Sequence, residues 1–233
     1  MDNRLDTRPH VLITGGTRGI GRAVADELAA THHLLIGGRD RDAVDAVVAS
    51  YPSAEPFVAD LTSEDDVAAA APGVDRLDAL VHSAGITAMG TVEDLARATW
   101  REVFEVNVVA VADLTARLLP ALRRAHGQVV LINSGSGFFT SPGNSVYSAS
   151  KFALRAFSDT LREEEREHGV RVTSIHPGKV DTDMQRQIVD HQGGDYRADS
   201  YLTPESVARA VVFALSATPE AQVESLNVRP MGR

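Results

Sequence analysis

Short apolar runs rich in valine, isoleucine and leucine alternate along the chain with longer segments in which apolar residues recur at a helical period. Apolar runs without polar alternation are typical of strands that are buried on both faces of a sheet. The runs that predict strands span residues 10–14, 33–37, 56–59, 77–82, 128–133, 171–176 and 224–228. The segments that predict helices lie near residues 19–31, 41–50, 63–71, 97–124, 145–168 and 204–217.

This alternation runs through the whole chain and predicts the fold class α/β. Strand–helix–strand repeats build a parallel sheet with helices on both faces. We therefore expect a single doubly wound Rossmann-type domain with a seven-stranded parallel sheet over residues 9–233. Residues 1–8 are expected to form a loose N-terminal tail. The periodicity fades over residues 183–201, where HQGGDYRADS at residues 191–200 is expected to form a loop. In such a sheet ligands bind beyond the carboxyl ends of the strands, so functional residues should follow the strands.

Composition and charge narrow the choice of partners. Hydrophobic residues make up 43% and charged residues 24% of the 233 positions, which is ordinary for a soluble globular protein. The net charge of −9 repels nucleic acid and anionic lipid, so we expect neither nucleic acid nor a membrane as a partner. There is no apolar N-terminal stretch or long apolar segment, and a cytoplasmic protein is expected. No cysteine and no cluster with metal-ligand spacing is present, so no metal is expected.

The sequence TGGTRGIG at residues 14–21 follows the first predicted strand and leads directly into the first predicted helix. Its glycines allow a tight turn and a close approach of the backbone to a pyrophosphate, which then lies at the positive end of the helix dipole. A glycine-rich turn can be a plain connection, but this position in the first β-α unit favours dinucleotide binding. We therefore expect the coenzyme half at about residues 9–125 and the catalytic and substrate half at about 126–233.

The end of the second predicted strand bears on the choice of coenzyme. An acidic residue there would bond the adenosine ribose 2′-hydroxyl of NAD, whereas a nearby arginine accommodates the 2′-phosphate of NADP. Gly38 stands at the likely acidic position and Arg39 follows it, while Arg18 in the glycine turn could reach the same phosphate. The alternative is that Arg39 only solvates a loop beside Asp40 and Asp42. We favour NADP (NADPH) over NAD.

Tyr147 and Lys151 in the sequence YSASK are four residues apart, which places them on one helix face, one turn apart. A phenol has a pKa of about 10, and lowering it to about 7 requires roughly 4 kcal/mol. A cation about 4 Å away contributes on the order of 4 kcal/mol at an effective dielectric near 20. We therefore expect the lysine, helped by an oxidised nicotinamide, to lower the pKa of the tyrosine. Ser134 stands thirteen residues before the tyrosine.

Together these motifs resemble the short-chain dehydrogenase/reductase superfamily over nearly the whole chain. The glycine turn is similar to the coenzyme turn of that family, and YSASK to its Y-x-x-x-K pair. Asp60 in VADLT stands where the family has an aspartate that contacts adenine. HSAG at residues 82–85 is similar to the N-A-G motif of the family, with Ser83 in place of asparagine. Asn107 in EVNVVA matches the helix asparagine of the family, and HPGKVDTD at residues 176–183 its P-G motif.

The resemblance implies roles for these residues. Tyr147 would exchange a proton with the substrate oxygen while Ser134 polarises the carbonyl, Lys151 would reach the nicotinamide ribose, and Asn107 would hold a water that links Lys151 to solvent. Thr182 would bond the nicotinamide carboxamide. The coenzyme is expected to contact Gly15, Thr17, Arg18, Gly19, Ile20, Gly21, Arg39, Asp60, Leu61, Ser83, Ala84, Gly85, Tyr147, Lys151, Pro177, Gly178, Val180 and Thr182. Members of the family are commonly dimers or tetramers, so a homodimer or homotetramer is expected.

The expected activity is that of an NADP(H)-dependent oxidoreductase acting on a small-molecule carbonyl compound or secondary alcohol. One alternative is a non-catalytic NADP(H)-binding sensor or interaction protein on the same fold, which the intact Ser134, Tyr147 and Lys151 disfavour. Another is a coenzyme-free lyase such as a halohydrin dehalogenase. Those enzymes resemble this family but have arginine where Lys151 stands and lack the glycine turn.

Other chemistry-bearing residues have structural interpretations. His82 and His176 follow strands and are expected to be satisfied residues near the core rather than catalysts. The charged run at residues 162–168 is expected to be a solvated helix face. Core or subunit-interface positions are expected for Trp100, Val103, Phe104 and Val108.

The substrate pocket should be formed by segments that the motifs do not constrain. Residues 135–144, with Phe138 and Phe139, are expected to line one wall, which suggests an apolar substrate body. Residues 183–201 are expected to form a lid. The lid residues that can contact polar groups are Asp183, Gln185, Arg186 and His191.

Overall fold

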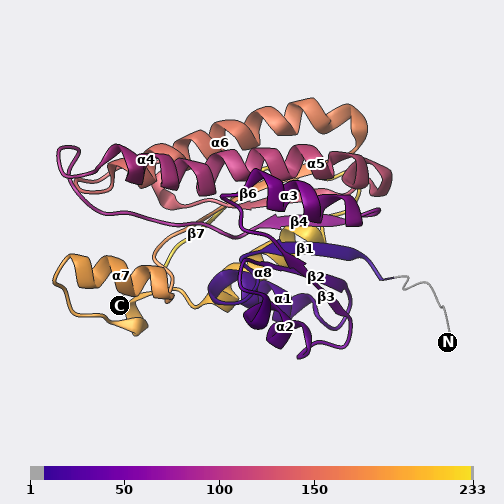
Figure 1. Cartoon of the computed structure of the whole chain (residues 1–233), viewed down its shortest axis with the longest axis horizontal. Helices are drawn as coiled ribbons and strands as arrows, with labels where there is room; N and C mark the ends of the chain where they lie inside the picture. Colours follow the sequence, from indigo (N-terminus) through magenta and orange to yellow (C-terminus); the bar gives the residue numbers. More distant parts are fainter. Residues whose placement is uncertain (1–7, 232–233) are drawn as a thin grey trace.

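The computed structural model describes residues 8–231, and within this range seven parallel strands form one sheet in the order β3-β2-β1-β4-β5-β6-β7 (Figure 1). The predicted tail at residues 1–8 lies outside the described range except for its last residue. The prediction of a seven-stranded parallel sheet is confirmed. The strands are β1 (His10–Thr14), β2 (His33–Gly38), β3 (Ala54–Val58), β4 (Ala79–His82), β5 (Gln128–Ile132), β6 (Arg171–Pro177) and β7 (Ser225–Val228).

Helices cover both faces of this sheet because its central strands are apolar on both sides (Figure 1). Val11 and Ile13 of β1 pack toward one face with the core residues of α1, α2 and α8, and Leu12 packs toward the other with those of α3, α5 and α6. The helices are α1 (Gly19–Leu28), α2 (Arg41–Val48), α3 (Glu64–Ala70), α4 (Arg97–Phe104), α5 (Ala110–Ala125), α6 (Ser145–Glu165), α7 (Asp183–His191) and α8 (Pro204–Leu215).

The strand order reverses between β1 and β4, and this is where a ligand-binding crevice forms in a doubly wound sheet. The hydroxyl of Thr14, the last residue of β1, accepts hydrogen bonds from the backbone N–H groups of Ser83 and Ala84, each 3.1 Å long. These bonds tie the chain that leaves β4 to the end of β1. The backbone at the base of the crevice, at the ends of β1 and β4, is therefore held in place.

Two predicted helical boundaries differ from the structure. The predicted helix at residues 97–124 is interrupted at Glu105–Val109 by a π-helical turn between α4 and α5. The sequence pattern predicts no helix over residues 183–191, but these residues form α7. Thr182 caps this helix, since its hydroxyl accepts a hydrogen bond from the N–H of Gln185. The helix is short and mostly polar, and this weakened its periodicity in the sequence.

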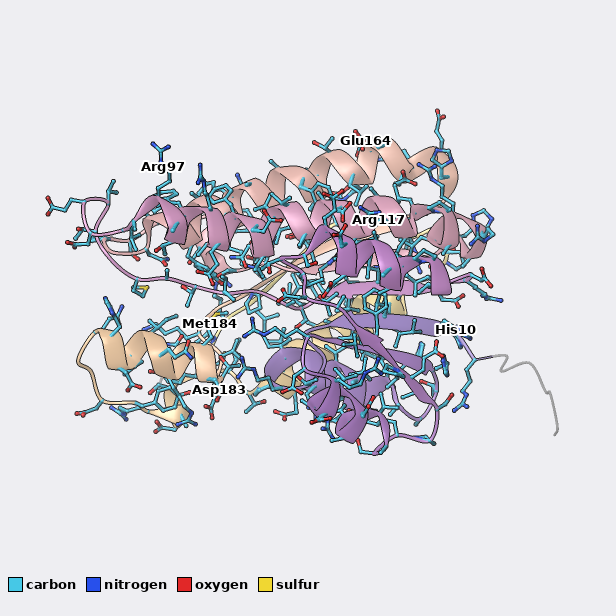
Figure 2. All side chains as sticks on the ribbon, viewed as in Figure 1. His10, Arg97, Arg117, Glu164, Asp183 and Met184 are labelled. Atoms are coloured by element: carbon cyan, nitrogen blue, oxygen red, sulfur yellow. The ribbon has the colours of Figure 1, made fainter. Side chains whose placement is uncertain are left out.

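The C-terminal end of α6 is not wholly the solvated face predicted for residues 162–168. Glu164 does point away from the sheet (Figure 2), but Arg162 and Glu165 are buried. The guanidinium of Arg162 donates to the carbonyl oxygens of Val172, at 3.1 Å, and Glu224, at 3.1 Å.

Glu165 is held from the neighbouring helix, because the guanidinium of Arg123 in α5 donates to both of its carboxylate oxygens, at 2.9 and 2.6 Å. Buried charges are tolerated only when they are paired in this way. Arg162 and Glu165 thus fasten the far end of α6 to β6 and α5.

We expect Arg162→Ala to lower the free energy of unfolding by about 2–3 kcal/mol, because it removes buried charge-assisted hydrogen bonds to backbone carbonyls. The matched control is Arg166→Ala at the residue that follows α6, where the exposed arginine pairs with Glu163, one turn back in the helix. This control should lose less than about 1 kcal/mol. Urea unfolding of both variants measures the difference, and equal losses would contradict the assignment of Arg162 as the fastening residue.

Candidate active site

A pocket of about 390 Å³ opens beyond the carboxyl ends of the strands. Its walls come from the segments that follow β1, β5, β6 and β7, from the start of α6 and from α7. Figure 2 shows Asp183 and Met184 at the end of α7 that is nearest to the sheet. The residues that line the pocket include Ile20, Met89, Asn133, Ser134, Phe139, Asn144, Tyr147, Pro177, Gly178, Lys179, Val180, Thr182, Met184, Gln185, Ile188 and Arg229.

The glycine turn has the backbone conformation that a close-fitting phosphate site requires. Gly15 and Gly19 have φ angles of 63° and 56°, in the left-handed region that favours glycine. A Cβ atom on Gly21 would lie 2.3 Å from the carbonyl oxygen of Gly15, so only glycine fits there. Helix α1 begins at Gly19, and its N-cap residue Arg18 makes no side-chain cap. The first N–H groups of α1 are therefore left for an anion, which fits the diphosphate of a dinucleotide.

The residues expected around adenosine make contacts of their own. The carboxylate of Asp60 accepts hydrogen bonds from the N–H and the hydroxyl of Thr62, at 2.9 and 2.8 Å. These bonds hold the pKa of Asp60 below its usual range, and the nearby Arg39 guanidinium adds to the effect. Leu61 is half-buried and packs against the core on the side of the sheet that α3, α5 and α6 cover. Arg39 itself is exposed after β2.

Arg18, which was expected to help Arg39 bind the 2′-phosphate, forms an ion pair in this structure. Its guanidinium donates to the carboxylate of Asp183, the first residue of α7, at 3.3 Å. A Cβ atom on Gly19 would also lie 3.6 Å from the Cγ2 of Thr182. The glycine turn is thus in direct contact with the start of α7, which no pattern in the sequence indicated.

Ser134, Tyr147 and Lys151 come together at the junction of β5 and α6. Ser134 follows β5 and lines the pocket with Tyr147. Lys151 lies one turn further along α6, where its ammonium donates to the carbonyl oxygen of Ile132 at 3.1 Å and lies 5.6 Å from the centre of the Tyr147 ring. The four-residue spacing therefore places Tyr147 and Lys151 on one face of α6, as predicted, and Ser134 reaches Tyr147 from the segment after β5.

The pKa of Tyr147 in this structure shifts in the direction opposite to the expected one. Burial raises the pKa of Tyr147, and the hydrogen bond with the Ser134 side chain only opposes that rise. Burial lowers the pKa of Lys151 to about 8. The pKa of Tyr147 is not lowered because the Lys151 ammonium points to the carbonyl oxygen of Ile132 and not to the phenol oxygen. Without a closer cation, burial decides which form of the phenol is favoured.

Asn107 lies inside the π-helical turn that interrupts the helix between α4 and α5. The side chain is buried, and its amide forms a pair of hydrogen bonds with the backbone of Ile86, both 2.9 Å long. Its Nδ2 also donates to the hydroxyl of Ser150 at 3.0 Å. A Cβ on Gly85 would lie 3.3 Å from the Asn107 oxygen. Asn107 therefore joins the loop after β4 to α6 beside Lys151.

His82 and His176 are buried and have partners, as expected. Nε2 of His82 lies 2.8 Å from the hydroxyl of Thr115, which itself donates to the carbonyl of Val111, so the imidazole is the donor. Burial lowers the pKa of His82 to about 3. Nδ1 of His176 lies 3.0 Å from the carbonyl oxygen of Ser134. Burial also lowers the pKa of His176, so the neutral ring donates from Nδ1 to this carbonyl.

The walls of the pocket match the expectation in part. Phe139 lines the pocket, but Phe138 does not, because its ring packs on His176 with ring centres 4.4 Å apart. From the lid, Gln185 lines the pocket. Arg186 instead bonds Asp181 at 2.9 Å.

The sequence interpretation missed several pocket residues. The missed residues are Met89, Asn133, Lys179 and Arg229, whereas Asn144, Met184 and Ile188 lie in the segments that were expected to form the wall and the lid. Arg229 directly follows β7, so the rule that functional residues follow the strands could have found it. In the described part of the chain, no helix is long and apolar enough to cross a bilayer, and no group of three or more metal-binding side chains occurs.

Comparison with known proteins gives a consistent family. The sequence pattern of the short chain dehydrogenase family matches residues 9–193. An uncharacterised short-chain type dehydrogenase/reductase of Sinorhizobium fredii is 33% identical over 228 residues, 95% of this chain and 91% of the relative. The serine 3-dehydrogenase of Agrobacterium fabrum is 31% identical over 235 residues, 96% of this chain and 94% of the relative.

The solved structures lead to the same family. An alcohol dehydrogenase from the archaeon Thermococcus sibiricus, in complex with 5-hydroxy-NADP, has a TM-score of 0.88 and 25% identity over 97% of this chain and 98% of its own. The structure of a short chain dehydrogenase/reductase family protein has a TM-score of 0.85 and 30% identity, over 95% of this chain and 96% of its own. The chain belongs to the short-chain dehydrogenase/reductase family of nicotinamide-dependent oxidoreductases.

Proposed function

We propose that this protein transfers hydride between NADP(H) and a carbonyl compound or secondary alcohol, with Tyr147 as general acid and base. The observation that carries the proposal is the grouping of Tyr147 and Ser134 in the lining of one pocket, with the ammonium of Lys151 5.6 Å from the Tyr147 ring. When bound, the coenzyme supplies or accepts the hydride. The catalytic side chains of this chain manage the proton and the charge on the substrate oxygen.

In the reductive direction the chain must supply a proton and stabilise negative charge. The raised pKa of Tyr147 keeps its phenol protonated at neutral pH, which suits a general acid. Ser134, whose side chain is hydrogen-bonded to that phenol, supplies a second hydroxyl that can polarise the carbonyl. Lys151 holds positive charge one helical turn away and favours the phenolate that remains after proton donation.

The preference for NADP over NAD rests on the end of β2. A Cβ atom on Gly38 would lie 2.7 Å from Val44 and 3.3 Å from Thr17, so an acidic side chain that would select NAD does not fit without rearrangement. Arg39 follows as an exposed cation. Arg18 can add a second cation if it leaves Asp183. These features support the binding of the 2′-phosphate.

We also propose a homodimer or homotetramer, with α4 and α5 in the interface, and a cytoplasmic location. Val103 is buried in the monomer, but Val109 is 49% exposed at the junction of the two helices. Trp100 and Phe104 are half-buried on the same helix and stack with ring centres 6.3 Å apart. An apolar surface of this kind favours association with a second copy.

We expect Tyr147→Phe to lower the rate of carbonyl reduction by about 10²–10⁴-fold, since it removes the proton donor, while the variant still binds NADPH. The matched control is Tyr51→Phe, because Tyr51 bonds Asp26 at the surface of the coenzyme half. The loss of NADPH absorbance with a panel of ketones and aldehydes measures the rates. Equal turnover by Tyr147→Phe would reject the catalytic assignment. NADPH binding without turnover of any carbonyl compound by the wild type would favour a non-catalytic sensor.

The low pKa of Lys151 makes the stability of the free protein depend on pH. The folded lysine has a pKa of about 8 against 10.5 in the unfolded chain, so folding releases a proton between these values. The free energy of unfolding of the wild type should therefore rise with pH across this window. Lys151→Met lacks this term, and its stability advantage over the wild type should shrink by about 2 kcal/mol between pH 7 and pH 9.5.

Urea unfolding at the two pH values tests this, with Lys179→Met as the control at an exposed lysine. An advantage of Lys151→Met that does not change with pH would show that Lys151 titrates normally.

If Arg39 binds the 2′-phosphate, Arg39→Asp should weaken NADPH binding by tenfold or more, about 1.4 kcal/mol, and leave NADH binding unchanged. Arg41→Asp makes the same charge change two residues later, at an exposed position on α2 that pairs with Asp45. Fluorescence titration with both coenzymes measures the affinities. Similar NADPH affinities in the two variants would make Arg39 an ordinary surface residue.

A further inference from the structure

Arg229, the residue after β7, is held at the pocket by hydrogen bonds from its guanidinium to nearby residues of β6 and β7. Its Nη1 donates to the carbonyl oxygen of His176 and, at 3.3 Å, to that of Val228. Its Nη2 donates to the side-chain oxygen of Asn227 at 3.2 Å. A guanidinium has five N–H donors, and these contacts with described residues use three of them. Two N–H donors are left for a ligand, on a guanidinium that the other three bonds hold in place.

This guanidinium lies close to the proposed catalytic hydroxyls. A Cβ atom on Gly135 would be 3.3 Å from Nη2 of Arg229, and Gly135 directly follows Ser134. His176 connects the two residues, because its carbonyl accepts from Arg229 and its Nδ1 donates to the carbonyl of Ser134. Arg229, Ser134 and Tyr147 all line the same pocket.

The pocket is positively charged although the chain carries a net charge of −9. Among the described residues, its lining contains the cations Arg229 and Lys179 and no carboxylate. Asp181 and Asp183, which alternate in the sequence with the lining residues Val180, Thr182 and Met184, are each paired with an arginine. Asp181 bonds Arg186 at 2.9 Å, and Asp183 bonds Arg18 at 3.3 Å. A cleft lined by one sign of charge concentrates ligands of the opposite sign.

Neighbouring groups do not neutralise this charge. Burial lowers the pKa of His176, and the Arg229 charge adds to that effect, so the imidazole is neutral at physiological pH. Gln185, Asn133 and Asn144 supply neutral polar groups to the same lining. The lysine side chain of Lys179 is exposed and makes no ion pair with the described residues.

We propose that Arg229, assisted by Lys179, binds a carboxylate of the substrate, so that the enzyme prefers short oxo acids and the corresponding hydroxy acids over neutral ketones and alcohols. This inference rests on the proposed hydride transfer. The planar fork of an arginine matches the two oxygens of a carboxylate. The nicotinamide ring must share the 390 Å³ pocket, since Val180 and Thr182 line it too, and the remaining space suits a short substrate.

The test compares each acid with its neutral amide: pyruvate with pyruvamide, and acetoacetate with acetoacetamide. We expect the wild type to reduce at least one of these acids with a kcat/KM about tenfold or more above that of its amide. Arg229→Gln should lower the kcat/KM for that acid about tenfold or more, mainly through KM, and leave the amide within about twofold. Lys179→Gln should cause a smaller loss in the same direction.

Arg155→Gln is the matched control, because Arg155 stacks on the ring of Phe138 and lies outside the pocket lining. It should leave the ratio of acid to amide unchanged. Equal loss for acid and amide in Arg229→Gln would mean that Arg229 only fastens β7 to β6, and would overturn the proposal. A wild type that reduces amides or other neutral ketones as well as the acids would also overturn it.

A binding measurement separates this inference from the proposed function. Malonate, which is not reduced, is titrated by calorimetry into the protein saturated with NADP⁺. Binding that is lost in Arg229→Gln and kept in Arg155→Gln supports the anion site, even if no carbonyl compound is turned over and the proposed hydride transfer fails. The absence of malonate binding together with the absence of any acid preference overturns the anion site, while reduction of neutral ketones would leave the proposed function standing.

Discussion

Lys151 places an ammonium group in the interior of the domain, with only 4% of the residue exposed. Its hydrogen-bond partner is the neutral carbonyl oxygen of Ile132, so burial is opposed by a dipole rather than by a full negative charge. The surroundings must therefore be shaped closely around it. A Cβ atom on Gly85 would lie 3.8 Å from the ammonium, and Asn107 ties the adjacent Ser150 to the loop after β4. The small residues beside Tyr147 follow from this need for space.

Helix α6 can carry this buried ammonium because both of its ends are anchored to the rest of the domain. Near its start, the Asn107 amide joins it to the loop after β4. At its other end, Arg162 and Glu165 connect it to β6 and α5 through buried charge-assisted hydrogen bonds. The proposed catalytic side chains Tyr147 and Lys151 therefore lie on a rigid element, which is what precise positioning requires. The walls of the pocket are built differently, since α7 is joined to the sheet through exposed segments and ion pairs.

The sequence predicted the features that repeat locally and failed where distant residues decide. The strands were found because both faces of the sheet are covered, which produces continuous apolar runs such as Val11 to Ile13. The glycine turn and the Tyr147–Lys151 pair were found because their geometry depends on spacing alone. The pairing of Arg18 with Asp183 joins residues 165 positions apart, and no local pattern encodes it. The burial of Glu165 was missed for the same reason, because Arg123 supplies its partner from another helix.

The same pairing explains how a strongly acidic chain can form a cationic pocket. Acidic residues outnumber basic ones by 32 to 23, so an average surface cleft would carry negative charge. Around this pocket the nearby aspartates are each paired with an arginine, and the cations that remain, Arg229 and Lys179, follow the adjacent strands β7 and β6. Because parallel strands end at one edge of the sheet, residues that are 50 positions apart in the sequence reach the same wall. The topology therefore places Arg229 and Lys179 in the same pocket lining as Ser134 and Tyr147.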